Sequence, residues 1–245
     1  MKKITNTKLK KLSKLNQKKY RKKFGTVIVE GFRVINHLLK NNVSINTIFF
    51  EKQEELAKIK TNDLSKIKVN KPTLRKLTST KTPQSIVAEV PIVKKGIFHY
   101  NYLIFLDDIR DPGNMGTIIR TAFAANYDGI ILSRHCCDPF NPKTIRASMG
   151  TVFTIPMQTK DKNWVIKSEL TKIVSVKEHG KNIFEDNLSL NKGYILVIGS
   201  EARGIRKSII AKSNLKITIP ASNQIDSLNA SVAAGILLYN LKYAN

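Results

Sequence analysis

The stretch Lys216–Ser231, which reads K-I-T-I-P-A-S-N-Q-I-D-S-L-N-A-S, joins two different hydrophobic patterns. Ile217–Ile219 is a short β-like run, and the next residue ends it because proline has no N–H to donate to a sheet. From Val232 onward the apolar residues follow the period of a helix. The stretch therefore predicts a strand, a polar loop and a helix, with Ser227 or Asn229 as the helix N-cap.

Two loops earlier in the sequence also follow an apolar run typical of a strand. Tyr102–Leu106 is an apolar run typical of a strand buried on both faces, and the turn-rich segment Asp107–Gly116 follows it. Tyr194–Ile198 is a second such run, followed by Gly199–Ile205. Ligands of open α/β sheets bind at the carboxyl ends of the strands. The three loops therefore predict an α/β fold with one site for a polar ligand.

The charge of the chain is unusual. Its 245 residues include 42 Lys and Arg against 18 Asp and Glu, which gives a formal net charge of +24. Such a field attracts RNA, DNA or an anionic membrane. No apolar run is long enough to span a membrane, and the N-terminus has no signal-peptide pattern. We therefore expect a nucleic-acid partner.

Several kinds of chemistry are disfavoured. The cysteines, Cys136 and Cys137, are adjacent and make neither a disulfide framework nor a zinc site, so we expect a metal-free cytoplasmic protein. Gly199 and Gly204 have the spacing of a Walker A loop, but Ile-Arg follows where Lys-Ser/Thr is needed. No G-x-G-x-x-G fingerprint is present.

The N-terminal 23 residues contain eleven basic residues and no acid. Leu9, Leu12 and Leu15 form a thin helical stripe between them. A basic helix or arm of this kind suits a phosphate backbone, to which it adds affinity without sequence specificity. The candidate RNA-binding residues in it are Lys18, Lys19, Arg21, Lys22 and Lys23.

Residues 24–93 alternate short strands and helices, which predicts a small α/β unit. The expected strands are Thr26–Glu30, Ile45–Glu51 and Ser85–Val90, and the expected helices are Val34–Leu39, Glu54–Lys60 and Pro72–Leu77. Glu30 and Arg33 flank a glycine where a strand passes into a helix, and both are RNA-binding candidates. Residues 94–101 are the expected linker.

In the second half we expect the helix Thr117–Asn126 after the first loop, and a loop with a helix start over Asp138–Arg146. The further strands are Gly129–Leu132, Thr151–Pro156 and Lys172–Val176. Asn114 lies just before the helix and Arg120 on its second turn, so both can face the same strand end. These patterns predict a polar-ligand site on a basic protein without identifying the reaction.

Three motifs resemble those of the SpoU, or TrmH-like, RNA 2′-O-ribose methyltransferases. They are N-x-G-x-x-x-R-T-A from Asn114, I-G-S-E-A-R-G-I from Ile198, and I-P…S-L-N-A-S-V-A from Ile219. All three occur in order, and the likeness covers residues 102–243. Residues 1–93 are similar to the L30e-like substrate-binding domain of some rRNA-modifying members, on the residues Lys18–Arg33, Ser79-Thr80 and Pro83-Gln84.

The resemblance implies a fold, a cofactor and an assembly. The fold is an L30e-like α/β domain over 1–93 and a methyltransferase domain with a deep trefoil knot over 102–245, a rare exception to unthreaded topology. S-adenosylmethionine would be held largely by backbone groups of Gly199, Ile219 and Leu228. The protein would be a homodimer whose active site is completed across an interface that includes the apolar C-terminal helix.

The resemblance also makes Arg120 the main catalytic residue. Around it would lie Asn114, Glu201, Ser227 and Asn229. The ribose 2′-oxygen attacks an activated methyl group, so the protein mainly positions the groups and assists removal of the hydroxyl proton. Because a free guanidinium stays protonated, we expect Arg120 to bind the target phosphate and stabilise the developing alkoxide rather than act as a base.

Two residues depart from the usual third motif. Ala221 stands where a larger apolar residue is common, and Asn223 where Gly is common. The N-terminal domain favours a guanosine of 23S rRNA, or of its precursor particle, as the substrate. Methylation of a tRNA ribose, and a non-catalytic RNA-binding role in ribosome assembly, are the alternatives.

Overall fold

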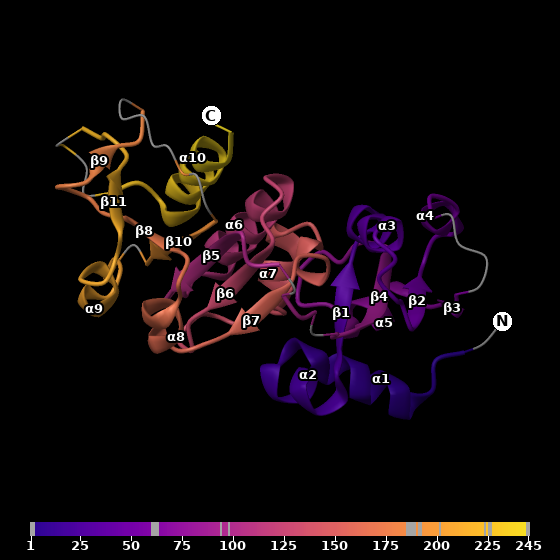
Figure 1. Cartoon of the computed structure of the whole chain (residues 1–245). Coiled ribbons are helices and arrows are strands. Elements are labelled where there is room, and N and C mark those ends of the chain that lie inside the picture. The colour runs from indigo at the N-terminus through magenta and orange to yellow at the C-terminus, as the bar shows by residue number, and fades with distance from the viewer. Residues whose placement is uncertain are drawn as a thin grey trace. The chain divides into compact units, whose positions relative to one another are not determined.

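The computed structural model describes residues 3–59, 64–93, 95–97, 99–184, 190, 193–200, 202–222, 224 and 227–243. The chain folds as two compact units (Figure 1). One comprises Met1–Val93 and Asp138–Thr154, and the other Lys94–Cys137 and Ile155–Asn245. The segment Asp138–Thr154 therefore packs with the N-terminal unit, although it follows a strand of the second unit.

The described part of the first unit is built on a four-stranded sheet of order β1-β4-β2-β3. The strands are β1 (Thr26–Glu30), β2 (Thr47–Phe50), β3 (Lys66–Lys68) and β4 (Ile86–Pro91). β4 is antiparallel to both β1 and β2, and β3 is parallel to β2. The sequence did not predict β3, because a three-residue K-I-K run has no alternation long enough to detect.

Helices cover both faces of this sheet (Figure 1). They are α1 (Asn6–Ser13), η1 (Lys14–Asn16), α2 (Lys18–Phe24), α3 (Phe32–Lys40), α4 (Gln53–Ala57), α5 (Lys71–Leu77), α7 (Pro142–Ala147) and η2 (Thr151–Phe153). The basic segment is part of this unit, since Leu12 and Leu15 are buried in one core with Phe49 and Leu77. Apolar packing thus fixes one side of the segment and leaves its lysines outside.

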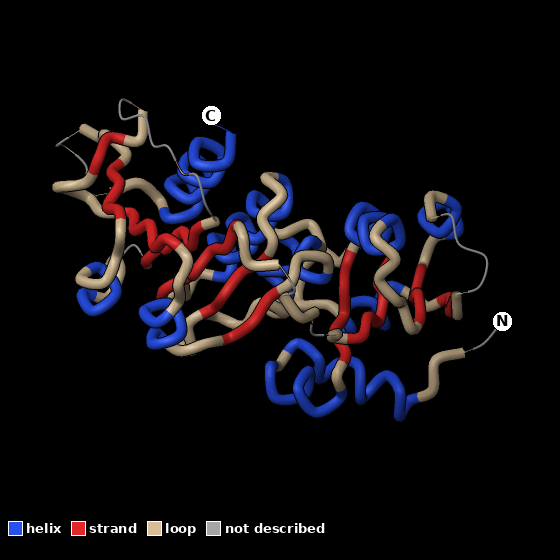
Figure 2. Tube along the Cα trace, in the orientation of Figure 1, coloured by secondary structure: helices blue, strands red, loops and turns tan. Residues whose placement is uncertain are grey.

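The described part of the second unit contains a seven-stranded sheet of order β7-β6-β5-β10-β8-β11-β9. The strands are β5 (Tyr102–Asp107), β6 (Gly129–Leu132), β7 (Met157–Thr159), β8 (Thr171–Ser175), β9 (Lys181–Asn182), β10 (Tyr194–Gly199) and β11 (Leu215–Thr218). Every neighbouring pair is parallel, so all the strands end at one edge. Figure 2 draws the strands in red. This confirms the predicted α/β class with a largely buried parallel sheet.

Helices lie on both faces of the sheet (Figure 1). They are α6 (Pro112–Ala124) and α10 (Ala230–Tyr243) on one face, and α8 (Lys162–Lys167) and α9 (Lys207–Ile210) on the other. α6 begins five residues before the predicted start, because the Asp111 carboxylate accepts a hydrogen bond from Asn114 N at 2.8 Å and Pro112 suits the first helical position.

The predicted strand Thr151–Pro156 is wrong. Its β-branched residues match a strand pattern, but Thr151–Phe153 is a 3-10 turn whose N–H groups bond locally. Gly150, with φ +87°, enters the turn in a left-handed conformation that favours glycine. The strand of this region is β7, which begins at Met157.

Candidate functional site

The first and third motifs meet at the carboxyl edge of the large sheet. Asn229 Nδ2 donates a hydrogen bond to Asn114 Oδ1 at 3.1 Å, although 115 residues separate them. Asn114 lies in the first turn of α6, and Asn229 directly precedes α10. The packing of α6 beside α10 therefore joins two predicted site residues in one hydrogen-bonded pair.

Asn229 is also the N-cap of α10. Its Oδ1 accepts hydrogen bonds from Ser231 N at 2.9 Å and from Val232 N at 3.4 Å, and from Ser231 Oγ at 2.7 Å. This confirms one of the two N-cap positions predicted from the sequence. The capping oxygen fixes the side-chain amide, so the other end of that amide is directed at Asn114.

Arg120 lies elsewhere on α6. Its side chain is exposed and, among the residues that the structure describes, it makes no hydrogen bond or ion pair. Six residues of α-helix turn the chain through about 600°, so Arg120 and Asn114 point roughly 120° apart around the axis. The placement of both residues at one strand end stays a prediction. Ser227 is exposed beside Asn229, and Glu201 falls outside the described residues.

The predicted cofactor residues follow strands that are close together. β8 lies between β10 and β11, so the strand ends at Gly199 and Ile219 are two strand spacings apart, about 10 Å. Gly199, Ile219 and Leu228 are all half-buried. Partly covered apolar side chains and a nearby glycine backbone fit a ligand that has an adenine ring and a polar tail, so these residues fit S-adenosylmethionine.

Gly199 has a structural requirement of its own. A Cβ there would lie 2.3 Å from Gly204 C and 2.5 Å from Ile205 N, because the loop folds back on its own strand. Gly204 N donates to Ser200 O at 2.8 Å and closes this turn. The second motif thus needs glycine for its shape. Of the two departures in the third motif, Ala221 is exposed and Asn223 lies outside the described residues.

A pocket of about 240 Å³ opens at the same edge. It is lined by Asp107, Asp108, Arg110, His135, Arg203, Gly204 and Arg206. Asp107 is completely buried and accepts hydrogen bonds at its Oδ2 from Arg206 N at 3.0 Å and Arg206 Nε at 3.1 Å. Arg203 and Gly204 belong to the second motif, but the sequence assigned no role to any of these side chains.

In the first unit, Glu30 is 8% exposed and holds a loop. Its Oε1 accepts hydrogen bonds from Gln84 N at 2.7 Å and Thr80 Oγ1 at 2.9 Å. The carboxylate is buried and binds the loop at residues 80–84, and the RNA contact predicted for Glu30 stays a prediction. Arg33 is exposed, with its guanidinium carbon 5.9 Å from the Phe32 ring centroid.

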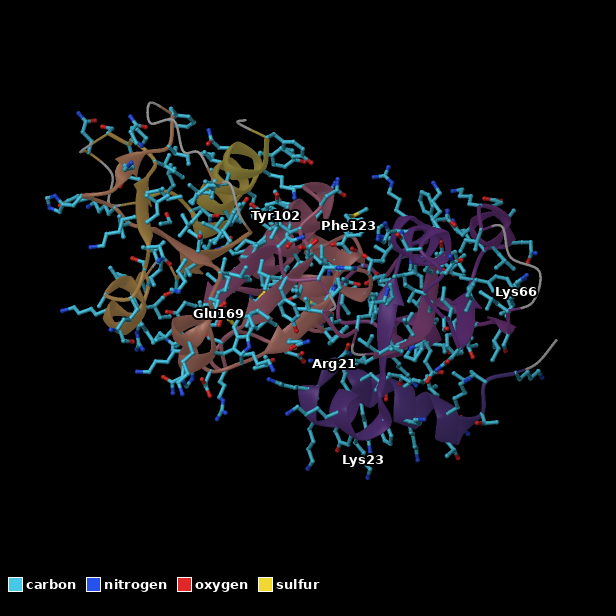
Figure 3. All side chains as sticks on the ribbon, viewed as in Figure 1. Arg21, Lys23, Lys66, Tyr102, Phe123 and Glu169 are labelled. Atoms are coloured by element: carbon cyan, nitrogen blue, oxygen red, sulfur yellow. The ribbon has the colours of Figure 1, made fainter. Side chains whose placement is uncertain are left out.

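Arg21 also has a structural role. It is 3% exposed, and it donates to Leu15 O and Asn16 O, both at 2.8 Å, and to Asp138 Oδ2 at 2.7 Å. Burial and these bonds occupy most of the guanidinium, and the RNA contact predicted for Arg21 stays a prediction. Lys18, Lys19, Lys22 and Lys23 are exposed, and Figure 3 labels Lys23 at the outer margin of this unit.

The Cys136 thiol donates a hydrogen bond to Leu106 O, with an Sγ–O distance of 3.2 Å. Burial raises the pKa of this thiol, which keeps it protonated and disfavours a reactive thiolate. Across the described ranges, no group of three or more His, Cys, Asp or Glu side chains could hold a metal ion. Of the helices in those ranges, none combines the length and apolarity that a membrane crossing requires.

Comparison with known proteins relates both units to RNA-modifying enzymes. Residues 101–239 match the SpoU rRNA Methylase family, and residues 6–88 match the MRM3-like substrate binding domain. Over 240 residues the chain is 29% identical to the 23S rRNA (guanosine(2553)-2'-O)-methyltransferase RlmP of Bacillus subtilis, covering 97% of this chain and 96% of the relative.

Two solved structures share the whole architecture. An AdoMet-bound rRNA methyltransferase from Sinorhizobium meliloti has a TM-score of 0.84 and 28% identity, covering 98% of this chain and 96% of that one. A structure described as a putative RNA methyltransferase of the TrmH family, from Porphyromonas gingivalis, has a TM-score of 0.86 and 25% identity, with complete coverage of both chains. Both likenesses extend over the two units.

Proposed function

Because this chain belongs to the SpoU rRNA methylase family, we propose that it methylates a guanosine ribose of 23S rRNA at the 2′-oxygen. The general activity is that of an S-adenosylmethionine-dependent RNA 2′-O-methyltransferase. The target comes from the RlmP relative, which matches almost the whole chain. A reaction on 23S rRNA would take place in the cytoplasm.

The observation that carries the proposal is the bond from Asn229 to Asn114. It joins the first and third motifs at the strand ends where Gly199 and Ile219 also lie. A site for ribose methylation needs polar groups beside the cofactor position, and this pair supplies them. The proposed cofactor contacts are Gly199, Ile219 and Leu228.

S-adenosylmethionine supplies an electrophilic methyl group, so the protein has to hold the ribose in line with it. We assign this positioning to Asn114 and Asn229, with Ser227 beside them. Arg120 would bind the target phosphate and stabilise the developing charge on the 2′-oxygen. Glu201 is proposed as a further site residue from its place in the second motif.

The exposed position of Arg120 supports a homodimer. On an ideal helix Asn114 and Arg120 point roughly 120° apart around the axis of α6. A second copy would supply its Arg120 to the Asn114–Asn229 pair. We further propose that the loops after β10 and β11 form the trefoil knot of the family.

The apolar surface of α10 supports the same assembly. Its inner side is fixed by Tyr127 Oη, which donates to Leu238 O at 3.2 Å, and by Lys242 Nζ, 3.1 Å from the Tyr102 ring centroid. Val232, Tyr239 and Tyr243 are exposed and share another side, at i, i+7 and i+11. A large exposed apolar patch of this kind is typical of a protein interface.

In the first unit, the exposed lysines of α2 and Arg33 are the proposed RNA contacts. Glu30 would act through the loop that it holds, and Arg21 through the fold of the unit. This unit favours rRNA over tRNA. It matches the MRM3-like substrate binding domain, and the chain is also similar to the mitochondrial rRNA methyltransferase 3 of Xenopus tropicalis.

The decisive experiment is to map 2′-O-methyl groups in total RNA from cells with and without the gene. We expect one guanosine of 23S rRNA to lose its methyl group when the gene is deleted. Loss of a tRNA methyl group instead would support the alternative substrate. Unchanged maps, with no calorimetric binding of S-adenosylmethionine in the presence or absence of RNA, would refute the proposed function.

A further inference from the structure

The pocket lined by Asp107, Arg203 and Arg206 has no role in the mechanism described above. It lies where the carboxyl ends of β5 and β6 approach the loop after β10, all within the second unit. Its volume of about 240 Å³ is below the roughly 300–1,000 Å³ of pockets that enclose a whole small-molecule ligand. The pocket therefore suits one group of a larger ligand.

Two carboxylates orient two of the three arginines that line it. Asp107 binds Arg206 through the backbone N–H and the guanidinium, as described above. Asp108 accepts two hydrogen bonds from Arg110, from Nε to Oδ1 and from Nη2 to Oδ2, both at 3.1 Å. A bidentate pair of this kind restricts the guanidinium to one orientation.

The backbone holds Asp108 in place. Its φ of +64° is left-handed, which is uncommon for a residue other than glycine. Its N–H donates to Ser133 Oγ at 3.0 Å, which ties the end of β5 to the residue after β6. An unusual conformation stabilised by a neighbouring strand is typical of a functional position.

The pocket retains donors and positive charge for an anion. Three guanidiniums face two carboxylates, which leaves these five groups with one net positive charge. Arg203 Nη1 lies 4.0 Å from Asp108 Oδ2, beyond hydrogen-bonding distance, and its side chain is 72% exposed. Since a guanidinium has five N–H donors, Arg203 and the free edge of Arg110 can bind a further acceptor.

We propose that this pocket binds a backbone phosphate of the RNA substrate, next to the nucleotide that is methylated. The inference rests on the proposed function. Arg110 precedes Asn114, in the first turn of α6, by four residues, so the pocket and the ribose site are close along the chain. The paired N–H donors of a guanidinium match the geometry of two phosphate oxygens.

Arg203→Ala in the full-length protein is the direct test, because the Arg203 guanidinium is 4.0 Å from Asp108 and its removal breaks no hydrogen bond to that carboxylate. The matched control is Arg134→Ala, an arginine of the same unit that is 73% exposed and pairs with Asp161 at 3.8 Å outside the pocket. The probe is a 23S rRNA transcript made in vitro, with binding measured from low to moderate salt. Binding of S-adenosylmethionine is measured by calorimetry in parallel.

We expect Arg203→Ala to weaken RNA binding about 5- to 10-fold and to lower the salt slope by roughly 0.7–0.9, the value for one phosphate contact. Arg203→Lys should recover part of the affinity, and Arg134→Ala should match the wild type. If the salt dependence of RNA binding has the same slope for Arg203→Ala as for Arg134→Ala, the pocket proposal is overturned and the proposed function is not. Weaker cofactor binding with unchanged RNA binding would also overturn the pocket proposal, since the anion would then be the methionine carboxylate. Wild-type protein that binds no rRNA would overturn the proposed function as well.

Discussion

The side chain of Asn229 binds in two directions, to Asn114 Oδ1 through Nδ2 and to the first turn of α10 through Oδ1. One amide thus caps a helix and positions a site residue from another helix. This arrangement couples the stability of the loop before α10 to the geometry of the proposed ribose site. Substitutions at residue 229 can separate the two roles.

Asn229→Asp should retain the cap and lose the site contact. A carboxylate still accepts from Ser231 N, but it has no N–H to donate to Asn114. We expect the free energy of unfolding to stay within about 0.5 kcal/mol of the wild type. Methylation should fall by about 100-fold, the typical effect of a misplaced reacting group. The measurements are urea denaturation and single-turnover methyl transfer.

Asn229→Ala should lose both roles, and stability should decrease by about 1 kcal/mol. Asp161→Ala is its control, because Asp161 caps α8 in the same way and lies outside the proposed site. The control should lose similar stability and keep its methylation rate. Full activity of Asn229→Asp would show that the contact to Asn114 is not needed.

Mixing two inactive variants tests whether Arg120 acts across a dimer. Arg120→Ala and Asn229→Asp each remove one part of the site. If the parts come from different chains, each mixed dimer has one intact site, and equal mixing should restore about a quarter of wild-type activity. The assay is methyl transfer after the variants are unfolded together and refolded. Activity no higher than that of the separate variants would place both residues in one chain's site.

Arg21 and Lys22 should have opposite effects, although they are adjacent. Arg21→Ala leaves the Asp138 carboxylate without its buried partner and should cost about 3–5 kcal/mol of stability. Lys22→Ala should leave stability unchanged and lower the salt slope of RNA binding by roughly 0.7–0.9. Thermal unfolding and filter binding separate the two effects. If Arg21→Ala is as stable as the wild type but binds RNA more weakly, Arg21 contacts RNA and does not act through the fold.

Glu30→Ala should weaken RNA binding even though it removes a negative charge. The loop at residues 80–84 would lose the acceptor for Gln84 N and Thr80 Oγ1. Glu55→Ala is the control, since it makes the same charge change on α4 in the same unit. Electrostatics alone would make both variants bind RNA slightly more tightly. RNA binding by Glu30→Ala that equals Glu55→Ala would show that the loop geometry does not matter.

Cys136 should be protected from alkylation at alkaline pH. Burial raises its pKa above the ordinary 9.0, so the folded chain keeps the proton at a pH where the unfolded chain loses it. This contributes stability that is fully present below pH 9.0 and is lost as the pH rises through the folded value. Iodoacetamide labelling at pH 8.5, read by mass spectrometry, should be much slower in the native protein than in urea. Equal rates would contradict the buried position of the thiol.

Local patterns determined many of the elements. β1 and β6 have the predicted bounds, because a run of β-branched and aliphatic residues between turn residues is a short-range signal. The three polar loops at strand ends, and the motifs within them, were also visible in the sequence. These features depend on neighbouring residues, and therefore a linear pattern carries them.

Packing between distant segments decided the rest. Arg21 and Glu30 have the composition of RNA-facing residues, yet Asp138 and the loop at residues 80–84 bury them. The pocket with Arg203 and the bond between Asn229 and Asn114 each join segments about a hundred residues apart. A charged side chain is free for a ligand only if the fold leaves its hydrogen-bonding groups unused. The sequence by itself determined the residue types and their loops, and only the tertiary structure decided which of those charges were still available.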